Sequence, residues 1–247
     1  MDRQIWTHNG ASQENQDICT VNTRVDLTEE GLGVCDRPVS VLNIRSLLVF
    51  LFSQNFGVHF SKKALRQFWS HATEHFEWGP AHPGRGTHVP LGLYGDSARY
   101  TNSAGYAEKL LCVTLSLPLY SPKSVRSSRY LIFSIRESLM VDFATTIWPI
   151  YSYIMQELNQ LFHSGIPGPQ GSVRFAVCEF RGDWAFHADS LALSRRWNSH
   201  SMCFKCPATS IPGPYQYTNF GELHDFSNVG FFNNCLKPGR LCNWYLI

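Results

Sequence analysis

The feature that most constrains this chain is an apolar run that ends in a glycine followed by an aspartate, and it occurs twice. The run at 172–180 is followed by Arg181 and then by Gly182 and Asp183, while the run at 88–94 is followed by Gly95 and Asp96. Short apolar runs that stop at a glycine are typical of buried strands. The sequence therefore predicts two buried strands, each delivering a carboxylate at its end.

The rest of the chain after residue 88 predicts a mixed α/β fold. Further periodic segments indicate two strands and two helices, at 107–120, 130–135, 143–162 and 188–197. Pro149 indicates that the longer helix either starts near this residue or is kinked there. In open α/β sheets functional side chains gather at strand ends, near a switch in strand order. If the two Gly-Asp strands are neighbours, Asp96 and Asp183 face each other.

The first third of the chain differs from the rest in its polarity and hydrophobic periodicity. Residues 1–36 are polar and show no clear periodicity, which predicts a loose N-terminal arm. Helical periodicity over 37–80 predicts a small helical region, in which one helix starts near Val39 and a second is capped by Ser61. After the loop, we expect the α/β core at 86–200, and then a loop-rich Cys/His segment at 200–247.

Composition narrows the class of protein. The chain is 44% hydrophobic and 16% charged, which suits a globular domain with a real core. A formal charge of +2 is compatible with nucleic-acid binding without indicating it. The polar start predicts no signal peptide, and the apolar run at 47–52 is too short to span a bilayer. We expect an intracellular protein, not secreted and without a membrane partner, whose eight cysteines are reduced.

Asp96 and Asp183 are candidate metal ligands and catalytic residues. Two carboxylates a few ångströms apart repel each other, and a divalent cation relieves that cost. A pair of Mg²⁺ or Mn²⁺ ions held in this way can activate water and stabilise a leaving oxygen in phosphodiester chemistry. We expect the glycine before each aspartate to allow a sharp turn and close approach of a substrate. The alternative is that each aspartate is a turn or N-cap residue after a strand.

The second constellation is His200, Cys203 and Cys206. Two thiolates separated by two residues can both reach a tetrahedral Zn²⁺, and the histidine would be a third ligand. The fourth ligand is unassigned, and the candidates are His187, His224, Cys235 and Cys242. A pair of buried free cysteines or a redox dithiol remains the alternative, although a redox dithiol normally opens a helix and Pro207 follows this pair directly.

Basic residues close to the two strands are candidates for nucleic-acid binding. Arg181, Arg195 and Arg196 follow the second strand, and another group lies at Lys123, Arg126 and Arg129. These side chains would neutralise backbone phosphates, and nearby aromatic residues would add stacking. A solvated basic face over a packed aromatic core is the alternative.

Three segments together resemble a known family. These are 89–100, which ends Tyr-Gly-Asp-Ser-Ala-Arg-Tyr, then Phe-Arg-Gly-Asp-Trp at 180–184, and the Cys-x-x-Cys at 203–206. With the order of strands and helices, they resemble the RNase H-like catalytic core of Asp-Asp-Glu transposases. They are similar to transposon-derived reading frames that are abundant in some protist genomes. The resemblance covers residues 88–210.

The resemblance implies a transposase-like domain that cleaves and transfers DNA strands with Mg²⁺ or Mn²⁺ in the nucleus. Asp96 and Asp183 would be its first two metal-binding carboxylates, and the Cys-x-x-Cys would lie in a zinc-braced insertion. The family also requires a third acidic residue, usually Glu, on a downstream helix. Only Glu222 and Asp225 follow Asp189, and neither lies in a predicted helix. The sequence therefore predicts a truncated transposase-like domain, active or inactive, or alternatively a non-catalytic nucleic-acid- or protein-binding module with structural zinc.

Overall fold

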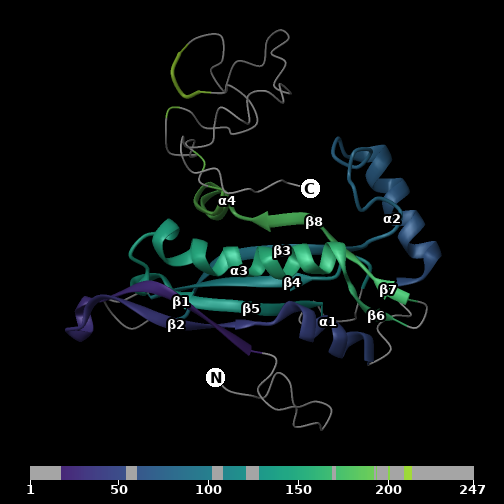
Figure 1. The fold of residues 1–247 in the computed structure, drawn as a ribbon. Helices are drawn as coiled ribbons and strands as arrows, with labels where there is room; N and C mark the ends of the chain where they lie inside the picture. The colour runs from purple at the N-terminus through teal and green to yellow at the C-terminus, as the bar shows by residue number, and fades with distance from the viewer. Residues whose placement is uncertain are drawn as a thin grey trace.

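The protein has a mixed α/β fold built on one four-stranded sheet (Figure 1). The structure, a computed structural model, describes residues 18–53, 60–101, 108–120, 128–168, 171–191, 193, 200 and 209–212. The strand order in the main sheet is β5-β4-β3-β8. The α/β class expected from the sequence is confirmed at this level.

The main sheet combines an antiparallel meander with one parallel strand. The meander consists of β3 (Val89–Arg99), β4 (Lys109–Ser116) and β5 (Arg129–Arg136). Strand β8 (Phe175–Gly182) pairs with β3 in parallel. A parallel neighbour requires a crossover connection. Helix α3 (Phe143–His163) lies in that crossover, as the strong helical periodicity of this segment predicts.

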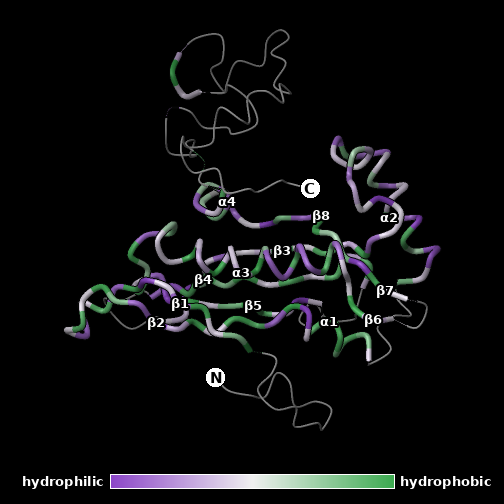
Figure 2. Tube along the Cα trace, in the orientation of Figure 1, coloured by the Kyte–Doolittle hydropathy of each residue, from purple (hydrophilic) through white to green (hydrophobic). Residues whose placement is uncertain are grey.

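The hydrophobic core lies between α3 and one face of the sheet. Alternate residues of β3, such as Leu91 and Leu93, are buried and face Ile147, Ile150 and other apolar residues of α3. The apolar stretches of these elements follow the interior in Figure 2. Burying large aliphatic side chains stabilises the domain by about 1.5–3 kcal/mol each. The sheet has a second face, away from α3, and it is lined by more polar side chains.

The N-terminal region forms a β-hairpin, so the prediction of a loose arm over 1–36 is wrong for the residues described. Strand β1 (Ile18–Leu27) pairs antiparallel with β2 (Gly33–Leu42), and Val25 and Leu27 are buried in the main core. The region is polar overall because one side of the ribbon faces solvent. Helix α1 (Ile44–Ser53) starts later than its periodicity predicts, since Val39–Leu42 completes β2. Residues 1–17 lie outside the described part.

Helix α3 is continuous through Pro149, so the prediction that it starts near this proline is wrong. Its N-cap is Asp142, whose Oδ1 accepts a hydrogen bond from the Thr145 amide at 2.6 Å. Proline has no N–H to offer the carbonyl of Thr145, four residues earlier. The buried hydroxyl of Thr23 lies 3.4 Å from that oxygen and donates to the Thr146 carbonyl at 2.5 Å. The β-hairpin thus covers the gap in the helical hydrogen bonds.

Helix α2 (Lys62–His75) packs beside the amino-terminal end of β3. Ser61 caps it, as predicted, by accepting a hydrogen bond from the Ala64 amide at 3.2 Å. Trp69 is buried and its indole N–H donates to the His88 carbonyl at 2.9 Å. The minor elements are η2 (Thr28–Glu30), η5 (Glu137–Leu139), β6 (Ile166–Gly168), β7 (Gly171–Val173) and α4 (Trp184–Ser190). None of the helices in the described part of the chain is long and apolar enough to cross a membrane.

Candidate functional site

The two strands that carry the Gly-Asp pairs are neighbours. In the parallel pairing of β3 with β8, the register runs from Val89 opposite Phe175 to Gly95 opposite Gly182. Asp96 and Asp183 each follow directly after this last glycine pair. The chain therefore brings two carboxylates, 87 residues apart in sequence (183 − 96), to the same end of adjacent strands.

The paired glycines make room for an aromatic ring. The Phe186 ring lies across both of them: a Cβ at Gly95 would be 1.9 Å from its Cζ, and a Cβ at Gly182 would be 2.2 Å from its Cδ1. Phe186 is 5% exposed and stacks on Phe180, with ring centroids 5.3 Å apart. Gly95 lies inside β3, so the predicted sharp turn is wrong there. Close packing of α4 on the sheet is the physical reason for these glycines.

Asp183 is the N-cap of α4. Its Oδ1 accepts a hydrogen bond from the Phe186 amide at 2.7 Å, and the residue is exposed. The N-cap alternative for this aspartate is therefore correct as a description of its geometry. A carboxylate has about four lone-pair sites, so one hydrogen bond leaves it able to bind a cation. The helix begins at Trp184, earlier than the predicted 188–197, because Asp183 caps it.

Asp96 is half-buried inside β3. Its Oδ2 accepts from the Tyr94 hydroxyl at 2.8 Å, and its Oδ1 accepts from the Ser97 amide at 2.8 Å. The hydrogen bond to Asp96, followed by burial, raises the pKa of Tyr94 above its usual value. Cys112, opposite Asp96 on β4, has its thiol pKa raised by burial and by the Asp96 charge. Tyr94 and Cys112 thus both lie beside the Asp96 carboxylate on this part of the sheet.

Asp96 lies on the sheet face away from α3. Leu91, Leu93 and Gly95 point toward the core, and successive side chains in a strand alternate between faces. Tyr94 and Asp96 therefore belong to the opposite face. We call this the open face, defined by Tyr94 and Asp96 of β3, Cys112, Thr114 and Ser116 of β4, Arg129 of β5, and Glu179 and Arg181 of β8.

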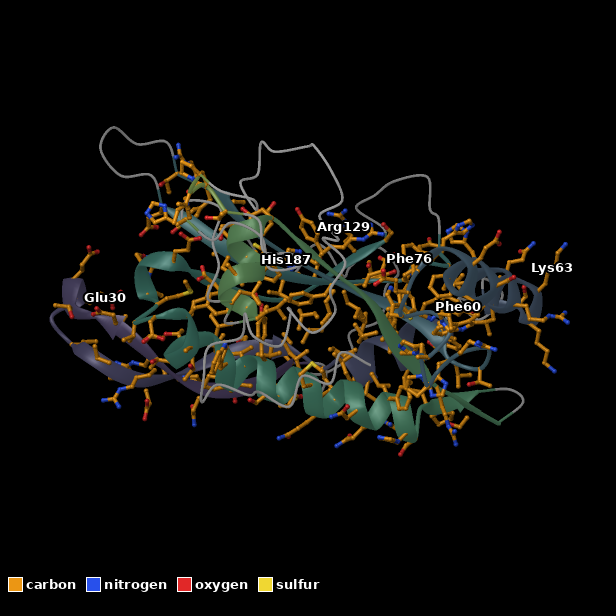
Figure 3. All side chains as sticks on the ribbon, turned by 90° about the horizontal axis from the view of Figure 1, so that it is seen from above. Glu30, Phe60, Lys63, Phe76, Arg129 and His187 are labelled. Carbon is orange, nitrogen blue, oxygen red and sulfur yellow. The ribbon has the colours of Figure 1, made fainter. Side chains whose placement is uncertain are left out.

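His187 lies close to Asp183 on α4, at the position labelled in Figure 3. Burial lowers the pKa of this imidazole, while the negative charge of Asp183 acts in the opposite direction. Its ring contacts Phe180 edge-on, with centroids 5.5 Å apart. The sequence marks His187 only as one possible zinc ligand. Its proximity to Asp183 follows from the four-residue spacing across the first turn of α4.

The candidate nucleic-acid-binding arginines differ in their surroundings. Arg181 is exposed and forms an ion pair with Glu179 at 2.6 Å, so its charge is largely compensated. Arg195 and Arg196 lie outside the described residues. Arg129, at the start of β5, places its guanidinium carbon 4.5 Å from the centre of the Tyr94 ring. The structure thus connects Arg129, through Tyr94, with Asp96.

The predicted zinc ligands are only partly described. His200 is exposed and its Nδ1 lies 3.2 Å from the Ser210 Oγ, whereas Cys203 and Cys206 lie outside the described residues. In the part of the chain that the structure describes, no group of three or more His, Cys, Asp or Glu residues is arranged to hold a metal ion. The predicted zinc site therefore stays a prediction.

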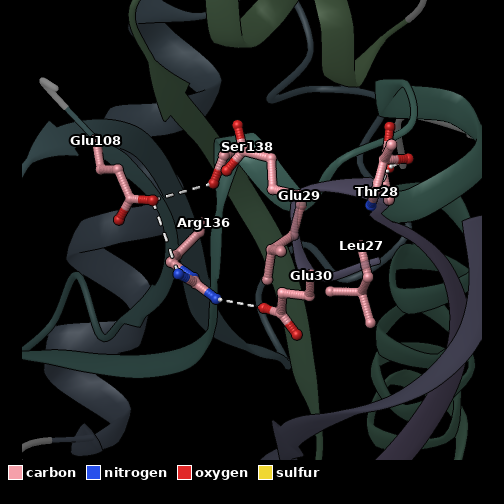
Figure 4. A pocket seen from close by; sticks show the side chains of 9 residues that line it. Leu27, Thr28, Glu29, Glu30, Glu108, Arg136 and Ser138 are labelled. Carbon is pink, nitrogen blue, oxygen red and sulfur yellow. Dashed lines mark hydrogen bonds and ion pairs between the residues drawn. The ribbon is translucent and has the colours of Figure 1, made fainter. Parts of the chain in front are cut away.

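A small polar pocket lies where the tip of the β1–β2 hairpin meets the main sheet (Figure 4). Arg136 extends between Glu30 and Glu108, with both nitrogen–oxygen distances at 3.7 Å. Ser138 donates to Glu108 at 3.3 Å. These contacts connect the hairpin to β4 and β5. Partly exposed ion pairs of this length contribute little stability, so we interpret the pocket as a link between elements.

Comparisons of this chain with protein-family models, with curated proteins and with solved structures found no match. Its function is therefore argued from the residues and their geometry.

Proposed function

We propose that the chain is a transposase-like domain with an RNase H-like core, in which Asp96 and Asp183 hold a divalent cation for DNA strand cleavage and transfer. One observation carries the proposal. Strand β8 joins the β5-β4-β3 meander in parallel, next to β3, and the two aspartates follow the last paired residues of these strands. This matches the arrangement that the resemblance implies for the first two carboxylates of such a core.

The chemistry of the two side chains suits a single Mg²⁺ or Mn²⁺ ion. Carboxylate oxygens are the ligands that these hard cations prefer, and Mg²⁺ is commonly bound by one or two carboxylates with water and substrate phosphates. Asp96 and Asp183 each keep free lone pairs beside their hydrogen bonds. Since the described residues provide no third acidic partner, the fit is to one ion and not to two.

The residues around the carboxylates would hold them in position. Tyr94 and the Ser97 amide fix the orientation of Asp96, and the first turn of α4 fixes Asp183. A bound divalent ion would supply Lewis acidity and lower the pKa of a bound water or 3′-hydroxyl for attack on a phosphodiester. His187, whose pKa burial lowers, would be largely neutral at pH 7 and able to accept a proton near Asp183.

A second candidate is a non-catalytic nucleic-acid-binding module that shares this ancestry. The observation that favours it is that no third His, Cys, Asp or Glu joins the two aspartates within the described residues. Such a module would keep the fold and the open face but lack metal-dependent cleavage. The two candidates differ in one activity, which can be measured directly.

The test is nicking of a supercoiled plasmid in the presence of Mn²⁺. We expect the wild-type chain to nick DNA, and Asp96→Asn and Asp183→Asn each to lower the rate at least tenfold. Asparagine is as good an N-cap as aspartate, so Asp183→Asn removes the charge and keeps the cap. Asp142→Asn is the matched control, because Asp142 caps α3 in the same way. A wild-type chain without activity would favour the binding module, and equal loss in the control variant would contradict the proposed site.

A further inference from the structure

Arg129 is distinguished from the other described arginine of the open face by its partner. Arg181 has a carboxylate partner, Glu179, at 2.6 Å. Arg129 forms no ion pair with any carboxylate in the described ranges, and its guanidinium lies over the Tyr94 ring. Figure 3 shows it on the side of the sheet away from α3. Arg129 therefore presents a positive charge that the described part of the fold does not neutralise.

The position of this charge is fixed by contacts that run to Asp96. The Arg129 guanidinium carbon lies 4.5 Å from the Tyr94 ring centre, an attraction worth about 0.5–1 kcal/mol at an exposed site. The Tyr94 hydroxyl in turn donates to Asp96 at 2.8 Å. Tyr94 thus contacts a cation with its ring face and a carboxylate with its hydroxyl. Two successive phosphates of an anionic polymer could use such a pair, one through an ion bound to the carboxylate and the other through direct contact with the cation.

Between Arg129 and Asp96, the open face carries short side chains from β4. Strand β4 contributes Cys112, Thr114 and Ser116 to the open face, all short side chains. On β3, Gly92 has no side chain, and the Ser116 hydroxyl donates to its carbonyl at 3.3 Å. Short polar side chains let an extended backbone come close to the sheet. Leu131 of β5, which pairs with Thr114, adds an exposed apolar side chain to this face.

We propose that Arg129 binds a backbone phosphate of a nucleic-acid strand that lies along the open face. A planar guanidinium can donate two parallel hydrogen bonds to phosphate oxygens, and its five N–H donors are more than a contact with Tyr94 uses. A neighbouring phosphate would then lie toward Asp96. This last step rests on the proposed function, whereas phosphate binding by Arg129 does not.

The test is oligonucleotide binding in EDTA, where divalent-metal chemistry is absent. Fluorescence anisotropy is measured with a short labelled DNA, single-stranded in one arm and duplex in the other. We expect Arg129→Ala to weaken binding about five- to tenfold and to reduce the slope of log K against log salt by about 0.7 for the single strand. Arg181→Ala is the matched control and should change affinity less than twofold, because Glu179 already compensates its charge.

A further variant separates the contributions of charge and geometry. Arg129→Lys keeps the charge but loses the planar fork, so we expect about half of the loss in log K. Unchanged affinity in Arg129→Ala, an equal loss in Arg181→Ala, or no binding by the wild-type chain would each overturn the inference. Binding that depends on Arg129 without any Mn²⁺-dependent nicking would support it and refute only the proposed catalysis.

Discussion

Replacing Gly95 with alanine tests how the sheet and α4 hold the two aspartates together. Backbone propensity alone predicts a gain, because alanine in a strand is about 0.5–1 kcal/mol more favourable than glycine. Packing predicts the opposite. The new Cβ would lie 1.9 Å from Cζ and 2.0 Å from Cε2 of Phe186, so the ring must move.

The size of the loss can be bounded from the structure. Overpacking a well-filled site costs about 1–3 kcal/mol. Complete loss of Phe186 packing would cost about 3–5 kcal/mol, since its ring is buried and stacked on Phe180. We therefore expect Gly95→Ala to lower the free energy of unfolding by about 2–4 kcal/mol. Urea denaturation followed by circular dichroism would measure it.

A double-mutant cycle identifies the cause. If Phe186 is the obstacle, Gly95→Ala combined with Phe186→Ala should be no less stable than Phe186→Ala alone, a coupling of a few kcal/mol. Gly182→Ala is the matched control, because its Cβ would also lie 2.7 Å from the Gly95 carbonyl oxygen. Truncating Phe186 cannot remove that backbone contact, so Gly182→Ala should remain destabilising. Additive effects at Gly95, or a stability gain from Gly95→Ala alone, would refute the reasoning.

Four other predictions concern stability. Burial lowers the pKa of His88 below its value in the unfolded chain, so the unfolded state binds the proton more tightly. The free energy of unfolding should therefore fall as the pH drops below about 6.5, and it should fall less in His88→Gln. Urea midpoints measured at about pH 7.5 and about pH 5 would show the difference. Asp183→Ala should cost about 1 kcal/mol and Asp183→Asn almost nothing, measured by thermal melting; equal losses would argue against the cap. Thr23→Val should cost about 1–3 kcal/mol because the Thr146 carbonyl loses a buried donor, whereas Arg136→Ala should change urea stability by less than about 1 kcal/mol.

The sequence alone predicts the central elements well. The apolar runs that become β3, β4, β5 and β8, and the periodic helix α3, all depend on local pattern and burial. These are properties that short segments carry by themselves.

The remaining features depend on contacts between distant residues. The β1–β2 hairpin is polar on its solvent side, so its strands become recognisable only when Val25 and Thr23 contact α3. The role of Gly95 depends on Phe186, which is 91 residues away (186 − 95). The difference between Arg181 and Arg129 depends on which side chain lies beside each guanidinium. Periodicity and composition do not contain that information.

The most direct test of the central claim is the binding of Mn²⁺ to the purified chain, measured by electron paramagnetic resonance of the free ion. If Asp96 and Asp183 form one site, the wild-type chain should bind one ion, and Asp96→Asn and Asp183→Asn should each weaken it strongly. The double variant should lose little more than either single variant, because the carboxylates act together. Mn²⁺ binding that is unchanged in both single variants, or weakened equally by Asp142→Asn, would contradict the account.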